Sequence, residues 1–345
     1  MTGDWLEFRV ASLEAKTAEI AREEVASAPM AIDGRMDRRR FIILFGAIAS
    51  LAPAVADERK PKIGFLDWFR PTMKGDLDHF REGMEQFGYV EGKNYEIEAY
   101  FTDGDRALTQ DLARKLVRQP VDILVALATP AVHITKETTH TIPIVMLTAN
   151  ALATGLVLSL SHPGGNLTGV SLMMTDTSGK RLELLREIRP SLHAVVFLGS
   201  AKDPNTATFV RETQIAADHL GIALSVRLVD RPAAIDQALF DAIKRDGNDA
   251  VIVQPIFTGW QDKIVAMSMT ARLPVIADFA VFAEAGALLT YGANQAALIR
   301  RMAYYVDRIL KGAKPADCRS SSRLNLNSSS TPARSPNSPG RSRRA

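Results

Sequence analysis

Cysteine is almost absent from this chain of 345 residues. The single thiol, Cys318, lies near the C-terminus, in a segment whose composition differs from that of the rest. The body of the protein can therefore form neither a disulfide framework nor a cysteine-based metal site. A body without cysteine is compatible with an oxidising compartment, although many cytosolic domains also lack the residue.

An excess of charge of either sign is also missing. Of the 42 basic and 39 acidic residues, seven and eight lie in residues 1–56, and six arginines but no acid lie in residues 318–345. The central segment therefore has a net charge of −2. A nearly neutral body offers no basic face for nucleic acid, so we expect no nucleic-acid partner.

The chain has no apolar run long enough to span a bilayer, which takes about 20 residues. Its longest run, Phe41–Ala49, follows the basic stretch Met36–Arg40 and precedes the small residues Pro53–Ala56. This order of basic, apolar and small residues predicts a cleavable signal peptide at residues 36–56 and a periplasmic protein. Arg39-Arg40-Phe41 hints at twin-arginine export, and Sec export is equally open.

A signal peptide begins at the N-terminus, yet residues 1–35 precede this one. We expect that the start codon was assigned too far upstream and that Met36 is the true start. The alternative is a genuine cytoplasmic extension.

Motifs for catalysis and cofactor binding are missing as well. There is no Gly-x-Ser-x-Gly elbow, and none of the six histidines has a spacing typical of a metal site. Gly164-Gly165 lacks the Walker spacing, which favours a tight turn. We therefore expect no enzyme, no cofactor and no metal ion.

What the sequence does have is a regular alternation of short apolar runs and helical patterns from Ile63 to Leu310. This alternation predicts an α/β fold with βαβ units and parallel sheets. The pattern restarts once, which indicates two Rossmann-like lobes joined by a hinge. We place the first lobe at residues 60–166 plus about 280–312, and the second at residues 167–279.

Five stretches carry a resemblance to a known family: residues 80–92, 129–131, 155–157 with 163–169, 178–185 and 304–317. In this order they resemble the ABC-transporter substrate-binding proteins of the periplasmic-binding-protein type I fold, in the group related to tryptophan-type binding components. The resemblance implies a monomeric solute-binding protein that delivers a small ligand to the permease and ATPase subunits of an importer. The chain departs from the family pattern at Asn150-Ala151 and at Gly199–Asn205, two expected cleft positions.

Two other classes remain open at this stage. One is the ligand-sensing core of a LacI-type transcriptional regulator, which shares the architecture and would need a DNA-binding segment. The other is an α/β enzyme without a recognisable motif.

Ligands of open α/β sheets lie at the carboxyl ends of strands, so residues at those positions are the candidate site. We expect an amino acid or a related carboxylate between the lobes. The N–H groups after Thr129 would hold a carboxylate, and Asp278 or Asp67 would pair with an ammonium group. Simple helix capping is the other interpretation of Thr129-Pro130. The full candidate set is Asp67, Trp68, Thr129, Thr148, Asn150, Asn205, Ile256, Asp278, Phe279 and Tyr291.

The last segment, residues 318–345, is rich in serine, arginine and proline and has no apolar periodicity, which predicts disorder. Related proteins continue after this point approximately as LPVEQPTQFELVIN. A gene encoding that continuation, with one base deleted after the Asp317 codon, encodes residues 318–331 of this chain one by one. We therefore expect a frameshift and the loss of the family's final strand and helix.

Overall fold

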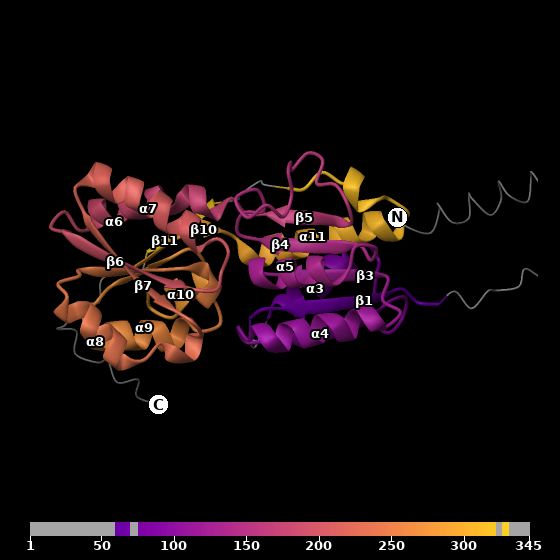
Figure 1. Ribbon diagram of the computed structural model, residues 1–345, viewed down its shortest axis with the longest axis horizontal. Helices are drawn as coiled ribbons and strands as arrows, with labels where there is room; N and C mark the ends of the chain where they lie inside the picture. The colour runs from indigo at the N-terminus through magenta and orange to yellow at the C-terminus, as the bar shows by residue number, and fades with distance from the viewer. Residues whose placement is uncertain (1–58, 70–74, 322–325, 331–345) are drawn as a thin grey trace, which may run out of the picture. The chain divides into compact units, whose positions relative to one another are not determined.

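The computed structural model describes residues 59–69, 75–321 and 326–330, all within one compact unit of the chain (Figure 1). The expectations for residues 1–35 and for the signal peptide at 36–56 lie outside the described residues. Within the described part of the chain, no helix combines the length and the apolarity that crossing a membrane requires.

The first lobe, which we define as residues 59–69, 75–171 and 295–321, is built on a five-stranded parallel sheet of order β2-β1-β3-β4-β5. Helices α3 and α11 cover one face, and α4 and α5 cover the other. Its elements are β1 (Lys62–Asp67), α3 (Asp76–Glu85), β2 (Glu96–Phe101), α4 (Arg106–Arg118), β3 (Ile123–Leu127), α5 (Thr129–Thr138), β4 (Ile144–Thr148), β5 (Leu167–Ser171), α11 (Gln295–Leu310) and the short helix η4 (Pro315–Asp317).

The second lobe, residues 178–293 and 326–330, has a six-stranded sheet of order β11-β10-β9-β8-β6-β7. All its pairs are parallel except β10 with β11. Its elements are α6 (Ser178–Ile188), β6 (Ala194–Ser200), α7 (Thr206–Leu220), β7 (Ala223–Val229), η2 (Pro232–Ala234), α8 (Gln237–Arg245), β8 (Ala250–Val253), η3 (Pro255–Phe257), α9 (Gln261–Thr270), β9 (Val275–Ala277), α10 (Ala280–Glu284), β10 (Leu289–Ala293) and β11 (Leu326–Ser330).

The central strands are apolar throughout because helices cover both faces of each sheet. Alternate residues of a strand point to opposite faces. In β3, Ile123 and Val125 join the core under α3 and α11, whereas Leu124 and Ala126 join the core under α4 and α5. The expected α/β fold with two parallel sheets is confirmed.

Both sheets share one strand order. In each, the first strand lies between the second and the third, so the order reverses between strands one and three. Ligands of such sheets bind outside the carboxyl ends of the strands at this reversal. The topology therefore directs attention to the residues after β1 and β3 in the first lobe, and after β6 and β8 in the second.

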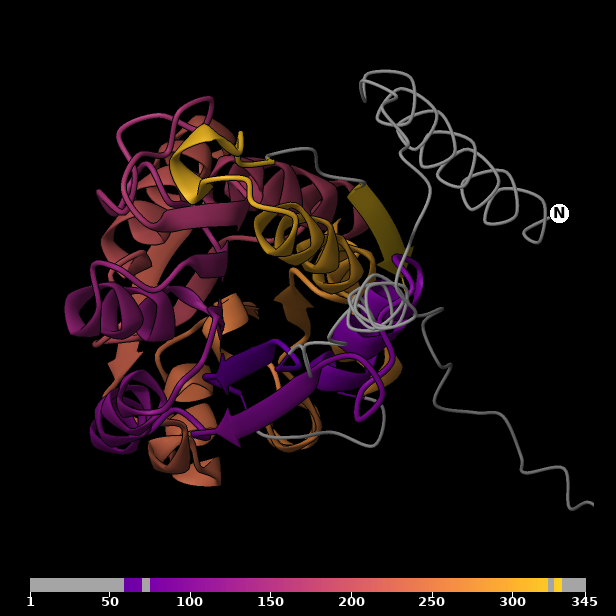
Figure 2. The same cartoon turned by 90° about the vertical axis from the view of Figure 1, so that its right-hand side faces the viewer.

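Helix α11 comes after the second lobe in the chain but packs on α3 of the first (Figure 2). The two helices approach so closely that a Cβ atom on Gly83 would lie 2.5 Å from the Arg300 carbonyl oxygen. Only glycine fits at this point. The expectation that a segment near the C-terminus returns to the first lobe is therefore met by α11.

The lobe boundaries differ from those expected. Strand β5 begins at residue 167 and pairs with β4, so it belongs to the first lobe rather than the second. Strand β10, expected in the first lobe, pairs with β9 of the second. The chain crosses between the lobes through the short helix η1 (Met174–Thr177) and again between Ala293 and Gln295. Apolar strands look alike in both lobes, so the sequence pattern could not assign these two.

The expected disorder from residue 318 onward also needs correction. Cys318 and Ser320 are buried, the Thr168 hydroxyl donates to the Cys318 carbonyl at 2.7 Å, and Ser321 bridges to Val170. Residues 326–330 form β11. Backbone N–H and C=O groups form a ladder whatever the side chains are, which explains a strand of sequence LNSSS. Residues 331–345 lie outside the described part.

Candidate functional site

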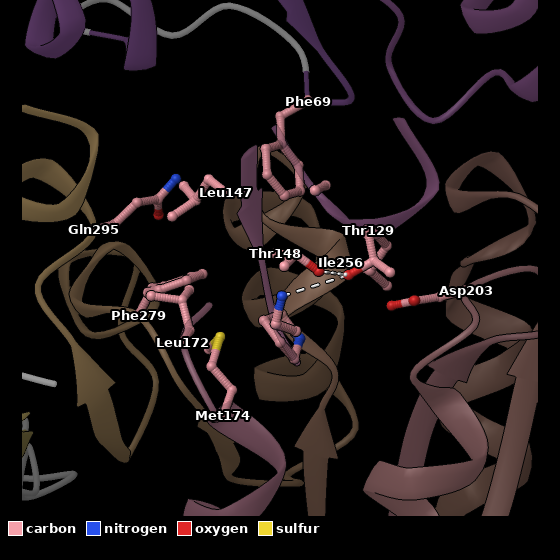
Figure 3. A pocket seen from close by; sticks show the side chains of 13 residues that line it. Phe69, Thr129, Leu147, Thr148, Leu172, Met174, Asp203, Ile256, Phe279 and Gln295 are labelled. Atoms are coloured by element: carbon pink, nitrogen blue, oxygen red, sulfur yellow. Dashed lines mark hydrogen bonds between the residues drawn. The ribbon is translucent and has the colours of Figure 1, made fainter. Parts of the chain in front are cut away.

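One cavity lies where strands of both sheets end. Its lining residues end a strand or follow one within a few positions, as the topology leads us to expect. The cavity opens to solvent, and the space free of protein atoms is about 410 Å³ when the open mouth is included. It is lined by Phe69, Ala128, Thr129, Leu147, Thr148, Ala149, Leu172, Met174, Asp203, Pro255, Ile256, Phe279 and Gln295 (Figure 3).

Hydroxyl groups form one polar side of the cavity. The Thr129 Oγ1 atom accepts hydrogen bonds from Asn205 Nδ2 at 2.7 Å and from the Ala149 N–H at 3.4 Å, and lies 2.7 Å from Thr148 Oγ1. Either hydroxyl can be the donor of the Thr129–Thr148 bond. When Thr129 donates, its oxygen keeps two lone pairs for Asn205 and Ala149, and the Thr148 O–H is left to donate into the cavity.

The start of α5 adds backbone donors on the same side. The first N–H groups of a helix have no intrahelical acceptor, and Pro130 has no N–H at all. Ala128, the residue before the helix, has φ of +71°, a strained value for a residue other than glycine. Its N–H donates to Leu147 at 2.9 Å, and its carbonyl accepts from Val132 at 3.1 Å. These bonds hold the sharp turn that starts α5 at the cavity.

Asp203 is the one charged residue that lines the cavity. Its carboxylate accepts hydrogen bonds from the Asn205 N–H at 2.9 Å and from Gln254 Nε2 at 2.7 Å. Burial raises the pKa of Asp203 to about 6, and the two hydrogen bonds oppose that rise. The carboxyl group is thus a fixed acceptor, ionised at neutral pH, with no basic partner among the described residues.

Gln254 holds Asp203 in place. Its Oε1 atom accepts from the Ser200 N–H at 2.8 Å and from the Thr206 hydroxyl at 3.1 Å, which leaves Nε2 to donate to Asp203. Gln254 is fully buried. The carboxylate is therefore oriented before any ligand arrives.

The other end of the cavity is apolar. Figure 3 places Phe69, Leu147, Leu172, Met174 and Phe279 away from Asp203. The one polar side chain at this end is Gln295, the first residue of α11. The cavity thus combines hydrogen-bonding groups at one end with a mainly apolar chamber at the other.

Asn205 has an atom that the described protein does not satisfy. Its Nδ2 donates to Thr129, but its buried Oδ1 has no hydrogen-bond partner in the described part of the chain. An acceptor left unpaired in this way costs about 1–3 kcal/mol. A donor supplied by a ligand or by water would remove that cost.

Half of the expected site residues meet at this cavity. Thr129, Thr148, Ile256 and Phe279 line it, and Asn205 contacts it through Thr129. These residues were expected because each follows or ends a strand.

The structure places Asp278 elsewhere. Its carboxylate pairs with Arg181 of α6, and both side chains are buried. Burial raises the pKa of Asp278 to about 7, and the Arg181 guanidinium lowers it. Asp278 therefore already has a cation, and it borders a neighbouring cavity rather than the one in Figure 3.

Asp67 and Trp68 also lie away from the cavity lining. Asp67 is buried and accepts from the Phe69 N–H at 3.0 Å. Its pKa is raised well above 3.8, first by burial and then by the charge of Asp76. Trp68 is 5% exposed and belongs to the core shared with α4 and α5. The indole is thus packed in the core, and the next residue, Phe69, lines the cavity instead.

The last two candidates have structural partners. Asn150 donates to the Thr175 hydroxyl at 2.8 Å and accepts from the Ala153 N–H at 3.0 Å. Tyr291 lies in β10, and its carbonyl accepts from Arg181 at 3.5 Å. Neither residue lines the cavity.

Sequence reasoning missed Phe69, Asp203 and Gln295. Each of them follows a strand closely, and Asp203 lies in the Gly199–Asn205 segment that departs from the family pattern. Those signals could have identified them. Leu172 and Met174 follow β5 in the same way, and the sequence analysis did not include them either.

Comparison with known proteins gives a consistent result. A family model described as ABC transporter substrate binding protein matches residues 70–329. A tyrosine-binding protein of Clostridioides difficile is 24% identical over 283 residues, covering 79% of each chain.

Two solved structures show the same fold. A conserved domain protein of Vibrio cholerae has a TM-score of 0.71 at 24% identity, covering 78% of this chain and 91% of that one. An ABC domain of Streptococcus pneumoniae in complex with L-Trp has a TM-score of 0.70, with the same identity and coverage. The expected periplasmic-binding-protein architecture is confirmed by these similarities.

Proposed function

This chain belongs to the ABC transporter substrate-binding protein family, and from that premise we propose that its ligand is an α-amino acid with an aromatic side chain. The family assignment makes the chain a solute-binding protein and not an enzyme, and it replaces the regulator and enzyme alternatives. The nature of the solute is our proposal.

The polar end of the cavity suits the two charges of an amino acid. Asp203 supplies a buried carboxylate without a basic partner, which would attract an ammonium group. The Thr148 O–H and the N–H groups at the start of α5 are donors, which a carboxylate requires. This combination of one acceptor and several donors is the observation that carries the proposal.

The apolar end suits an aromatic ring. Phe69 and Phe279 offer ring faces and edges, and Leu147, Leu172 and Met174 complete a chamber without charge. Burial of a large aromatic side chain there would supply much of the affinity, about 25 cal/mol per Å² of apolar area. Tyrosine and L-Trp, named for the two relatives above, are amino acids of this kind.

The direct test is isothermal titration calorimetry of the full chain with L-tyrosine, L-tryptophan and L-phenylalanine. Tyramine and 3-(4-hydroxyphenyl)propionate lack the carboxylate and the ammonium group, respectively. We expect each of the two analogues to bind at least roughly tenfold more weakly than tyrosine, because a charge-assisted hydrogen bond is lost. Equal binding of an analogue and its parent amino acid would remove the proposal.

A variant sharpens this test. Asp203→Asn should weaken amino-acid binding while leaving the binding of 3-(4-hydroxyphenyl)propionate unchanged, because that analogue has no ammonium group. Asp111→Asn, on the exposed side of α4, is the matched control and should behave as the native protein. A loss of affinity that is the same for the amino acid and the analogue would place the ammonium group elsewhere.

The partners and location follow from the same proposal. We propose that a periplasmic monomer delivers its ligand to the permease and ATPase subunits of an importer. The signal-like segment at residues 36–56 supports the location. Closure of the two lobes around the solute would present it to the permease.

A further inference from the structure

Gln295 holds a special position in the cavity. Thirteen residues line the cavity, and Gln295 is the one with a polar side chain at the apolar end, opposite Thr129, Thr148 and Asp203 (Figure 3). The side chain extends from the start of α11 toward Leu147. It also borders the neighbouring cavity together with Phe279. A ligand group that filled the apolar end would lie beside this amide.

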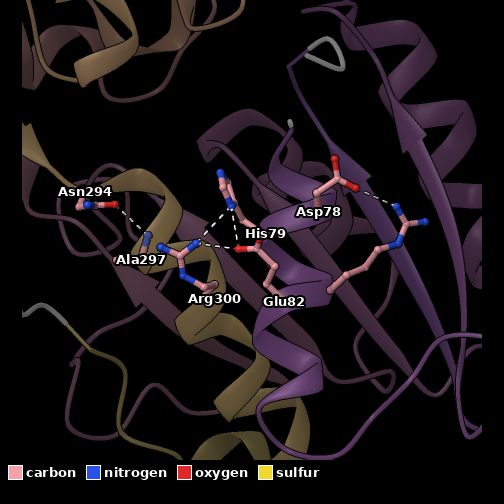
Figure 4. A network of polar contacts seen from close by, with 7 residues as sticks. Asp78, His79, Glu82, Asn294, Ala297 and Arg300 are labelled. Carbon is pink, nitrogen blue, oxygen red and sulfur yellow. Dashed lines mark hydrogen bonds and ion pairs between the residues drawn. The ribbon is translucent and has the colours of Figure 1, made fainter. Parts of the chain in front are cut away.

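The helix that carries Gln295 is firmly fixed to the first lobe. The Asn294 side chain caps α11 by accepting from the Ala297 N–H at 2.9 Å. One turn further on, Arg300 donates to Glu82 of α3 at 2.8 Å and lies 3.2 Å from His79 (Figure 4). Together with the close contact at Gly83, these bonds keep the start of α11 in place.

Asp76 determines which face of the Gln295 amide is available. The Gln295 Nε2 atom lies 3.2 and 3.1 Å from the two carboxylate oxygens of Asp76, at the start of α3. An ionised carboxylate only accepts hydrogen bonds, so the NH₂ side of the amide must face it. The carbonyl oxygen Oε1 is the remaining side, and none of the described residues donates to it.

We infer that Gln295 is a specificity-determining residue, whose Oε1 accepts a hydrogen bond from an N–H or O–H group at the far end of the ligand's ring. Phenol and indole carry such a donor, and a plain phenyl ring does not. Asp76 is a positioning residue that acts through Gln295. This inference rests on the proposed function, since the ammonium and carboxylate groups must occupy the other end of the cavity.

A hydrogen bond to Oε1 discriminates between ligands with and without a ring donor, in addition to strengthening binding. A phenyl ring beside Oε1 would displace water and leave a carbonyl without a donor, which costs free energy. A phenol or indole would satisfy it. The net preference for a ligand with a donor is therefore expected to be roughly 3- to 10-fold or more.

The experiment compares two ligand pairs on the full chain: tyrosine with phenylalanine, and tryptophan with 1-methyltryptophan, which lacks the indole N–H. The native protein should prefer the donor-bearing member of each pair. Gln295→Met keeps the length of the side chain and removes the acceptor, so both preferences should fall to about one, mainly through weaker binding of tyrosine and tryptophan.

Two further variants separate selection from simple packing. Asp76→Asn has an amide that can donate to Oε1, so it should also reduce both preferences while phenylalanine affinity stays unchanged. Gln214→Met removes a glutamine that donates to Asp218 on the exposed side of α7, and should leave every affinity unchanged.

The outcomes are distinguishable. Native protein that binds tyrosine and phenylalanine equally well would overturn this inference and leave the proposed function standing. Native protein that binds no aromatic amino acid would overturn both. Unchanged preferences in Gln295→Met, with native circular dichroism, would assign the selection to another residue.

Discussion

Asn205 of the second lobe donates a hydrogen bond from Nδ2 to Oγ1 of Thr129 in the first lobe, at 2.7 Å. Both side chains are buried, and both lie at the ends of strands that flank the ligand cavity. This bond joins residues that are far apart in the chain. It ties the lobes together at the place where the proposed ligand would enter, so it favours the closed arrangement.

The first prediction concerns this bond. Thr129→Val preserves the shape of the side chain but leaves the Asn205 amide without either partner, and it interrupts the donor chain to Thr148. Amino-acid affinity should fall roughly 3- to 10-fold, because one buried hydrogen bond is lost and the closed form becomes less populated. Titration calorimetry measures the affinity, and small-angle scattering should find the unliganded variant more expanded.

Thr270→Val, on the exposed side of α9, is the matched control for Thr129→Val. It should change neither affinity nor scattering. If Thr129→Val binds as tightly as the native protein, the hydroxyl chain has no part in ligand binding.

The second prediction is a pH dependence of binding. The pKa of Asp203 is about 6 in the unliganded protein, and an ammonium group binds the ionised form. Below this pH a proton competes with the ligand, so the dissociation constant should rise, approaching tenfold per pH unit. Asp203→Asn should lose this dependence. Titrations at pH 5, 6, 7 and 8 check it, and a flat profile in the native protein would contradict the role of Asp203.

The third prediction concerns stability at the same residue. The pKa of Asp203 in the folded protein, about 6, lies above its unfolded value of 3.8. The protonated carboxyl group therefore stabilises the folded state, and this contribution is complete below pH 3.8. The contribution is lost as the pH rises through about 6. At pH 7 the ionised carboxylate costs on the order of 3 kcal/mol. The stability of the native protein should therefore fall between pH 4 and pH 7 by more than that of Asp203→Asn, which has no titrating group at this position, as measured by urea unfolding.

The fourth prediction tests the buried ion pair of Arg181 and Asp278. Arg181→Met leaves a buried carboxylate without its cation and should cost about 3–5 kcal/mol at neutral pH. The double variant Arg181→Met/Asp278→Asn should lose less stability than Arg181→Met alone, because no buried charge remains unpaired. The pKa of Asp278 is already raised to about 7 by burial, so the loss in Arg181→Met should shrink toward pH 4. Additive losses would mean that the pair is not coupled.

The fifth prediction concerns strand β11. Its sequence LNSSS occupies the positions that FELVI would fill if the reading frame were restored. Ser328→Leu, Ser329→Val and Ser330→Ile together should raise the free energy of unfolding by roughly 1–3 kcal/mol, because apolar and β-branched residues favour strands more than serine does. An unchanged urea midpoint would show that this strand contributes little to stability.

The fold was largely predictable from the sequence. The expected alternation from Ile63 to Leu310 corresponds to alternating strands and helices in the structure. A continuous apolar run such as that of β4, between helical patterns, has few alternatives to a buried parallel strand. Strand β11 was not predictable, because a polar segment reveals nothing of the backbone ladder that an open neighbouring strand offers it.

The site was predictable only in part. The rule that ligands lie at strand ends identified Thr129 and Ile256, but it cannot say which of two adjacent residues faces the cavity. Trp68 points into the core and Phe69 borders the cavity, although both follow β1. The sequence does not reveal that Asp278 is paired, because its partner Arg181 is distant in the chain and no local pattern links the two residues. Asp278 was therefore expected to meet an ammonium group of the ligand.

The packing of α11 against α3 has a consequence for synthesis. A nascent chain emerges from its N-terminus, and domains usually fold as they appear. Here β1 to β5 and α3 emerge before α11, so the side of α3 at Gly83 lacks its helical partner until Arg300 has been made. The half of the molecule that is translated first is thus completed last. Until then the apolar surface that α11 later covers stays exposed.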